Sequence, residues 1–225
     1  MSQELSPKPP RQRRFVLLAL LAVLGATLFV PFFLAGAPGP VSLSFPLSFV
    51  VAASLVASVA TWFGLGWADG ARLPMPLLRQ YETRAPIRVN RQAVLGAIAS
   101  GVVVGVAGII ALRIAGVPGS AGSLLVKASS AFFAAITLES VLHLAIMSGV
   151  VRATRNVPLG IAVATVAYIG FHMLTLGGQP MNIVLTSVAG NGLAGLVFGW
   201  LYARFGYEYL IVSHFLAHVL AVGFA

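Results

Sequence analysis

All four histidines of the chain, together with one glutamate, lie inside long apolar stretches of the sequence. These residues are Glu139, His143, His172, His214 and His218. A charge near the bilayer centre costs about 3 kcal/mol or more, so ionisable side chains at that depth usually face a bundle interior or a water-filled cavity. One such histidine alone is well explained as a neutral packing residue. Five ionisable groups together favour a shared site.

The spacing of these residues places most of them in pairs. Glu139 and His143 are four residues apart, as are His214 and His218, so each pair shares one face of a helix. At about 1.5 Å per residue, all five residues lie roughly 14–25 Å from the nearest arginine that flanks their segment. His172, on a third segment, falls within this range. We therefore expect three helices to bring a carboxylate and several imidazoles to one point in the middle of the membrane.

Two hydrolytic mechanisms fit such a set of residues. In the first, His172, His214, His218 and Glu139 hold a divalent metal, Zn²⁺ in particular, with an open position for water. In the second, no metal takes part and Glu139 acts as a general base on a water held by the imidazoles. Carboxylate and histidine side chains also line the pathways of ion and proton transporters, which is the competing use of the same residues.

The composition predicts an integral membrane protein. Of the 225 residues, 59% are hydrophobic and only 8% are charged, far from the usage of a soluble domain. Seven apolar stretches each approach the roughly 20 residues that a membrane-spanning helix needs. We predict an all-α polytopic transmembrane bundle of about seven or eight helices, because backbone polar groups in lipid must be bonded within their own segment. The stretches are 15–36, 46–68, 93–112, 124–150, 157–176, 183–203 and 207–225.

The net charge of +9 reflects topology and not nucleic-acid binding. With the N-terminus in the cytoplasm, twelve of the fourteen basic residues fall on the cytoplasmic side, and Arg113 and Lys127 fall on the other. This pattern predicts a bacterial inner membrane protein whose cytoplasmic face attracts anionic lipids. The long stretch 67–92 carries five arginines. We interpret it as a basic loop on the membrane surface, with contact to a substrate or partner as the alternative.

One folded unit is expected. Residues 1–14 are predicted to form a basic cytoplasmic tail, and residues 15–225 a single transmembrane domain. The first apolar stretch is longer than the core of a signal peptide, so we interpret it as an uncleaved helix. The stretch 124–150 is the least regular, because Lys127 and Glu139 interrupt it. The absence of cysteine excludes disulfides, thiol catalysis and thiolate metal ligands.

Small and polar residues within the apolar stretches predict how the helices pack. Gly101 with Gly105, and Gly195 with Gly199, are spaced four apart, as in closely packed membrane helices. Asn191, between two glycines, is expected to hydrogen-bond a neighbouring helix, with a direct role in a site as the alternative.

Three short motifs resemble those of the CAAX protease and bacteriocin-processing family, also called CPBP or Abi, of intramembrane endopeptidases. The stretch HFLAH, from His214 to His218, resembles the late His-x-x-x-Asn/Asp motif of the family and follows a similar glycine-rich segment. The stretch YIGFH has His172 in the place of the family's Phe-x-x-x-His histidine and Tyr168 where Phe is usual.

The third motif, LESVLH, resembles the Glu-Glu-x-x-x-Arg motif of the family. Glu139 stands at the second glutamate, Leu138 at the first, and His143 at the arginine. The alternative register makes Glu139 the first glutamate and leaves Leu144 at the arginine position. We prefer the former register because a basic side chain then follows the carboxylate. The family-like core covers about residues 124–225.

The resemblance implies an all-helical intramembrane endopeptidase in which Glu139 activates water and His172 and His214 assist. His218 then stands where the family uses Asn or Asp, and an Asn there helps to stabilise the oxyanion. The implied substrate is a membrane-embedded peptide or a lipidated protein, and the mechanism is either zinc-dependent or metal-free. Because the first motif departs from the family pattern, a catalytically inactive CPBP-like scaffold is the alternative, beside a small His- and Glu-lined ion transporter. The oligomeric state does not follow from the sequence.

Overall fold

The computed structural model describes residues 11–36, 44–116, 123–174, 176 and 178–224, and these residues are helical with no strand among them. The all-α prediction is therefore confirmed. The helices are α1 (Gln12–Gly36), α2 (Ser44–Ala71), α3 (Pro76–Thr83), α4 (Arg91–Ala115), α5 (Leu124–Glu139), a π-helix (Ser140–Met147), α6 (Ser148–Thr154), α7 (Val157–Met173), α8 (Met181–Phe205) and α9 (Tyr207–Phe224).

Among the described residues, five helical segments are long and apolar enough to cross a membrane. They are Gln12–Pro31, Pro46–Ala71, Arg91–Ala115, Leu124–Thr154 and Met181–Phe205, and two shorter apolar helices, Val157–Met173 and Tyr207–Gly223, accompany them. The stretch that Lys127 and Glu139 interrupt is one continuous helical segment of α5, the π-helix and α6. Of its most apolar window, 72% is buried, against 22–28% in the other four segments. It is the most buried of the five segments, and Glu139, Ser140 and His143 within it are shielded by protein.

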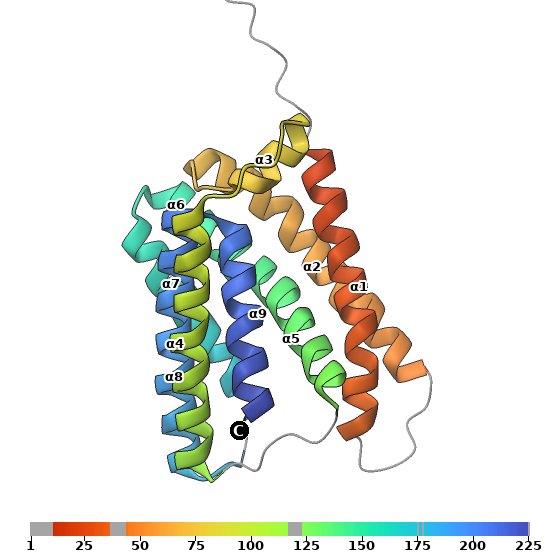
Figure 1. Cartoon of the computed structure of the whole chain (residues 1–225), viewed down its shortest axis with the longest axis vertical. Helices are drawn as coiled ribbons and strands as arrows, with labels where there is room; N and C mark the ends of the chain where they lie inside the picture. Colours follow the sequence, from red (N-terminus) through yellow and green to blue (C-terminus); the bar gives the residue numbers. More distant parts are fainter. Residues whose placement is uncertain (1–10, 37–43, 117–122, 175, 177, 225) are drawn as a thin grey trace, which may run out of the picture.

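The helices form two groups with α5 between them (Figure 1). Helices α4, α7, α8 and α9 pack side by side, α4 against both α8 and α9, and α7 against α8. Helices α1 and α2 pack on each other away from this group, and α5 contacts both α1 and α9. The carboxyl end of α5 therefore lies where it can meet residues of α9.

Glycines allow the close contacts within the four-helix group. A Cβ atom on Gly101 of α4 would lie 2.8 Å from the carbonyl oxygen of Ser213 in α9, and one on Gly195 of α8 would lie 2.9 Å from Cα of Thr165 in α7. Both distances are shorter than real Cβ contacts, so no larger residue fits without separating the helices. The prediction of close helix packing at these glycines is confirmed, and the packing fixes α9 and α8 around the site.

Charged residues gather at the end of the bundle where α3 lies (Figure 1). The guanidinium of Arg14, buried in α1, contacts Asp69 of α2 at 2.8 Å and Glu82 of α3 at 2.9 Å. The stretch predicted as a surface loop thus contains a helix that is clamped to α1 and α2. Helix α1 begins at Gln12, within the last residues of the predicted tail, and residues 1–10 of that tail lie outside the described residues.

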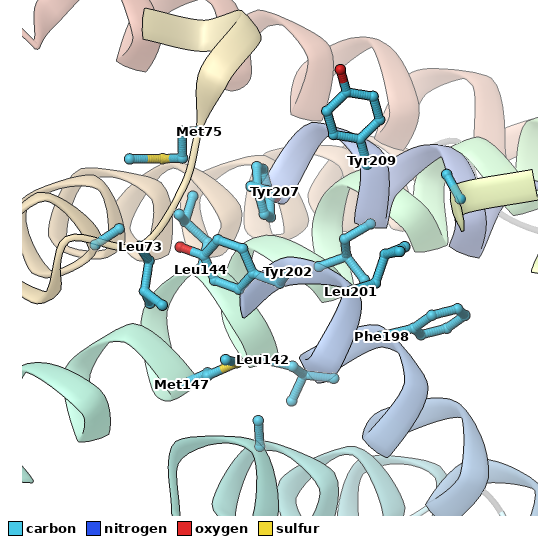
Figure 2. Packing of buried hydrophobic residues seen from close by; sticks show 14 of the residues in the cluster. Leu73, Met75, Leu142, Leu144, Met147, Phe198, Leu201, Tyr202, Tyr207 and Tyr209 are labelled. Atoms are coloured by element: carbon cyan, nitrogen blue, oxygen red, sulfur yellow. The ribbon is translucent and has the colours of Figure 1, made fainter. Parts of the chain in front are cut away.

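A cluster of large buried side chains fills the space between α2, the π-helix, α8 and α9 (Figure 2). Tyr202 and Tyr207 are fully buried there. Buried tyrosine hydroxyls need hydrogen-bond partners, and both find one on the central segment: Ser148 at 2.9 Å from Tyr202, and Ser140 at 3.0 Å from Tyr207. These two bonds hold both ends of the π-helix against α8 and α9.

Candidate functional site

The centre of the candidate site is the carboxylate of Glu139, which ends α5 and is fully buried. Its Oε2 atom accepts a hydrogen bond from Nδ1 of His143, and its Oε1 atom lies 2.5 Å from Nδ1 of His214. The sequence placed these three residues on two different segments. The structure brings them into direct contact, so the expected convergence holds for Glu139, His143 and His214.

A π-helix shapes this contact. It begins directly after Glu139, runs from Ser140 to Met147 and includes His143. The i→i+5 pairing of a π-helix widens the turn, and such turns are rare and frequently lie at functional sites. His143 is fully buried, and its ring lies between the carboxylate of Glu139 and the carbonyl oxygen of Gly195 in α8, 3.4 Å from Nε2.

The groups that face the ring nitrogens of His143 and His214 indicate which nitrogens donate a hydrogen bond. His143 faces an acceptor at each ring nitrogen, the carboxylate of Glu139 at Nδ1 and the carbonyl of Gly195 at Nε2, so each nitrogen is placed to donate a hydrogen bond. His214 differs, because its Nε2 atom faces the hydroxyl of Tyr168 at 3.5 Å, and a hydroxyl can donate. In the neutral form of His214 that donates from Nδ1 to Glu139, the lone pair is on Nε2 and can accept from Tyr168.

A cavity of about 420 Å³ is lined by His214 and by Tyr168, whose hydroxyl faces Nε2 of His214. Helices α4, α5, α7, α8 and α9 contribute its walls, which are mainly small and apolar side chains. The polar groups among its lining residues include Tyr168, His172, Asn191, His214 and His218, whereas Glu139 and His143 are not part of the lining. In the part of the chain that the structure describes, His214 thus connects the buried carboxylate to the cavity.

His218 does not contact Glu139, so the expectation that both imidazoles of SHFLAH face this carboxylate is wrong for one of them. One further turn of α9 carries the ring about 6 Å along the helix axis. The nearest polar partner there is Ser130 of α5, whose Oγ lies 3.4 Å from Nε2 of His218. His218 and His172 both reach the cavity, and the ring of His172 lies 4.9 Å from that of Tyr168.

Asn191 lines the cavity but does not bond a neighbouring helix through its amide nitrogen. Its Nδ2 atom donates to the carbonyl oxygen and to Oγ of Ser187, both at 2.9 Å, within α8. The predicted hydrogen bond to a neighbouring helix is therefore not made by the amide nitrogen. Ser187, one turn earlier in the same helix, supplies two acceptors instead.

The residues proposed as zinc ligands do not fit a metal ion in this arrangement. Both oxygens of Glu139 face ring nitrogens, Nδ1 of His214 faces the same carboxylate, and Nε2 of His218 faces Ser130. Within the described ranges, no group of three or more His, Cys, Asp and Glu side chains is arranged to hold a metal. The donor atoms of Glu139, His214 and His218 thus face separate partners and not one common centre.

Two residues of the site were not singled out as functional from the sequence. Tyr168 was noted only as a replacement for Phe, yet its hydroxyl meets His214 and its ring is 3% exposed. Gly195 was assigned to helix packing alone, although its carbonyl oxygen faces His143. The signal for Tyr168 was present in the sequence, since Tyr168 and His172 are four apart on one helix.

Comparison with known proteins adds nothing to these observations. No family model, no curated protein and no solved structure matches the chain. The resemblance to the CPBP family accordingly stays a prediction that depends on the three motifs.

Proposed function

We propose that this protein is an intramembrane endopeptidase of the CPBP type, which hydrolyses peptide bonds of membrane-embedded or lipidated substrates. The observation that supports it most is the contact between Glu139 and His214 at the wall of an apolar cavity. A carboxylate that orients an imidazole, whose other nitrogen faces a substrate-sized space, is the arrangement of a general base.

In the proposed reaction, Nε2 of His214 takes a proton from a water molecule as the water oxygen attacks the peptide carbonyl carbon. The resulting imidazolium is stabilised by the carboxylate of Glu139 at Nδ1. The same proton then passes from Nε2 to the leaving amide nitrogen, the C–N bond breaks, and a carboxylic acid and an amine are released. The histidine returns to its starting form, so proton and electron counts balance.

This assignment differs from the family mechanism in one respect. There the glutamate activates water directly, whereas here both carboxylate oxygens of Glu139 are occupied and the residue is sealed from the cavity. We therefore assign the base to His214 and a positioning and charge-balancing role to Glu139. His143 holds the carboxylate from the other side.

The proposal includes the topology that the charges predict. Seven apolar segments cross a bacterial inner membrane with the N-terminus in the cytoplasm, the two shorter helices α7 and α9 included. The arginine-rich end with α3 then faces the cytoplasm and anionic lipid headgroups. The cavity lies within the bundle, where a membrane-embedded peptide can reach it without crossing water.

Mapping new peptide N-termini tests the function without a known substrate. Purified protein is reconstituted into vesicles together with detergent-extracted bacterial membrane proteins, and new N-termini are labelled and identified by mass spectrometry. We expect the wild type to produce new N-termini within or beside apolar segments and His214→Gln to produce none. Val212→Ala is the matched control, because Val212 is on the same helix but half exposed at 50%.

Each outcome of this experiment decides between functions. Cleavage lost in His214→Gln and kept in Val212→Ala supports the proposal. A folded wild-type protein that creates no new N-termini overturns it and favours the inactive scaffold. If vesicles with wild-type protein instead pass protons or divalent metal ions, and His214→Gln stops the flux, the transporter function replaces the proposal.

A further inference from the structure

Tyr168 is the buried hydroxyl at which the cavity and the Glu139–His214 pair meet. It lines the cavity, is 3% exposed, and its oxygen lies 3.5 Å from Nε2 of His214. Its ring is fixed by neighbours on two sides, His172 at 4.9 Å and Phe198 at 6.4 Å between ring centroids. The hydroxyl is thus held at the cavity wall, next to Nε2 of His214.

Hydrolysis of a peptide bond needs a donor for the oxygen that becomes negative in the transition state. The family resemblance places His218 at the position that serves this task, and Asn191 is another polar side chain that lines the cavity. In the structure, Nε2 of His218 faces Ser130 and the amide nitrogen of Asn191 donates to Ser187. Both donors already have partners on the protein.

The bond between Tyr168 and His214 is the one that a substrate complex can replace. Its length of 3.5 Å is at the outer limit for a hydrogen bond, and a water molecule at Nε2 would form a shorter one of about 2.8–3.0 Å. The displaced hydroxyl is then available to donate to another acceptor in the cavity, because a buried hydroxyl needs a hydrogen-bond partner. The carbonyl oxygen of a bound peptide supplies that acceptor beside the attacked carbon.

We propose that Tyr168 is a further catalytic residue, whose hydroxyl donates a hydrogen bond to the carbonyl oxygen of the scissile peptide as negative charge develops there. The proton stays on Tyr168 throughout, so the balance of the reaction is unchanged. This role rests on the proposed function. The resembled family has Phe at this position, which carries no such donor, so the role belongs to this chain.

Tyr168→Phe tests the role, because it removes one oxygen atom and keeps the ring. The substrate is a quenched fluorescent peptide built on a cleavage site mapped as described above. We expect kcat to fall about 10²–10³-fold with KM changed less than about twofold, as for loss of an oxyanion donor. A phosphinate analogue of the same peptide, which carries a tetrahedral P–O⁻ group, should bind more weakly by a similar factor. The reduced analogue with CH₂–NH at that bond should bind equally to both proteins.

Tyr209→Phe is the control for loss of a buried tyrosine hydroxyl. Tyr209 is 3% exposed and its hydroxyl accepts a hydrogen bond from the backbone N–H of Asn90 at 3.2 Å, but it does not line the cavity. We expect its kcat per folded protein to match the wild type. Equal kcat in Tyr168→Phe and wild type would overturn the role of Tyr168 while leaving the endopeptidase function intact. A change confined to KM or to thermal stability would also overturn it. Absence of cleavage by the wild type would overturn both proposals.

Discussion

Glu139→Gln separates the chemical role of the central carboxylate from its structural role. The glutamine amide has the same size and can satisfy both imidazoles. Its oxygen accepts from Nδ1 of His214, and its NH₂ group donates to Nδ1 of His143, which then needs only its Nε2 hydrogen for Gly195. One N–H group of the amide is left without a partner, which is unfavourable, but a buried charge is removed as well, and exchange of a buried ion pair for neutral partners is often nearly neutral for stability. We therefore expect the unfolding temperature of the variant to stay within a few degrees of the wild type.

The rate of cleavage by Glu139→Gln should fall strongly, unlike its unfolding temperature. In the proposed reaction His214 becomes an imidazolium, and the carboxylate bonded to its Nδ1 atom stabilises that charge. With an effective dielectric constant of about 20 and about 4 Å between charge centres, the interaction is about 4 kcal/mol. Since about 1.4 kcal/mol corresponds to a factor of ten in rate, Glu139→Gln should lower kcat by about 10³-fold.

The assay pairs cleavage of the mapped peptide with thermal unfolding followed by tryptophan fluorescence in detergent. Glu139→Ala is the comparison, because it leaves an unfilled space and an imidazole without its acceptor, and should lower the free energy of unfolding by about 3–5 kcal/mol. Wild-type kcat in Glu139→Gln would refute the role of the carboxylate in the reaction. If Glu139→Gln unfolds at a temperature as low as that of Glu139→Ala, the negative charge of Glu139 is itself needed for stability.

Two further predictions concern the packing that positions the site. Gly195→Ala places a Cβ 2.9 Å from Cα of Thr165, so it should lower the free energy of unfolding by about 1–3 kcal/mol. Gly192→Ala is the control, because its Cβ meets only the flexible end of Ile169 at 3.5 Å, and it should be neutral or stabilising. Equal stability of the two variants would contradict the close approach of α7 and α8. Arg14→Leu leaves the buried carboxylate of Glu82 unpaired and should cost about 3 kcal/mol, whereas Arg79→Ala, at an exposed ion pair with Asp69, should cost less than about 1 kcal/mol. Urea unfolding in mixed micelles measures both pairs, and an equal loss for the two arginines would show that α3 is not clamped through Arg14.

Much of the architecture could be predicted from the sequence because its signals are local. The length of an apolar run can be counted directly and compared with the thickness of a membrane. Glycines four apart lie on one helix face whatever surrounds them. For the same reason Glu139 and His143 could be paired, since four residues of helix bring them together. The clamp of α3 could not be predicted, because Arg14, Asp69 and Glu82 are far apart in the chain and each alone is typical of a membrane surface.

The site itself divides in the same way. Histidine and glutamate inside apolar segments indicated by themselves that a polar centre lies within the bundle, since lipid cannot solvate them. Which groups touch was decided by the crossing of α5 and α9, which brings His214 onto Glu139 and leaves His218 with Ser130. The tertiary structure also placed Tyr168 at the cavity and Glu139 behind it. Residue type and spacing determine what chemistry a segment can carry, whereas contacts between segments depend on helix crossings and close approaches that no single segment specifies.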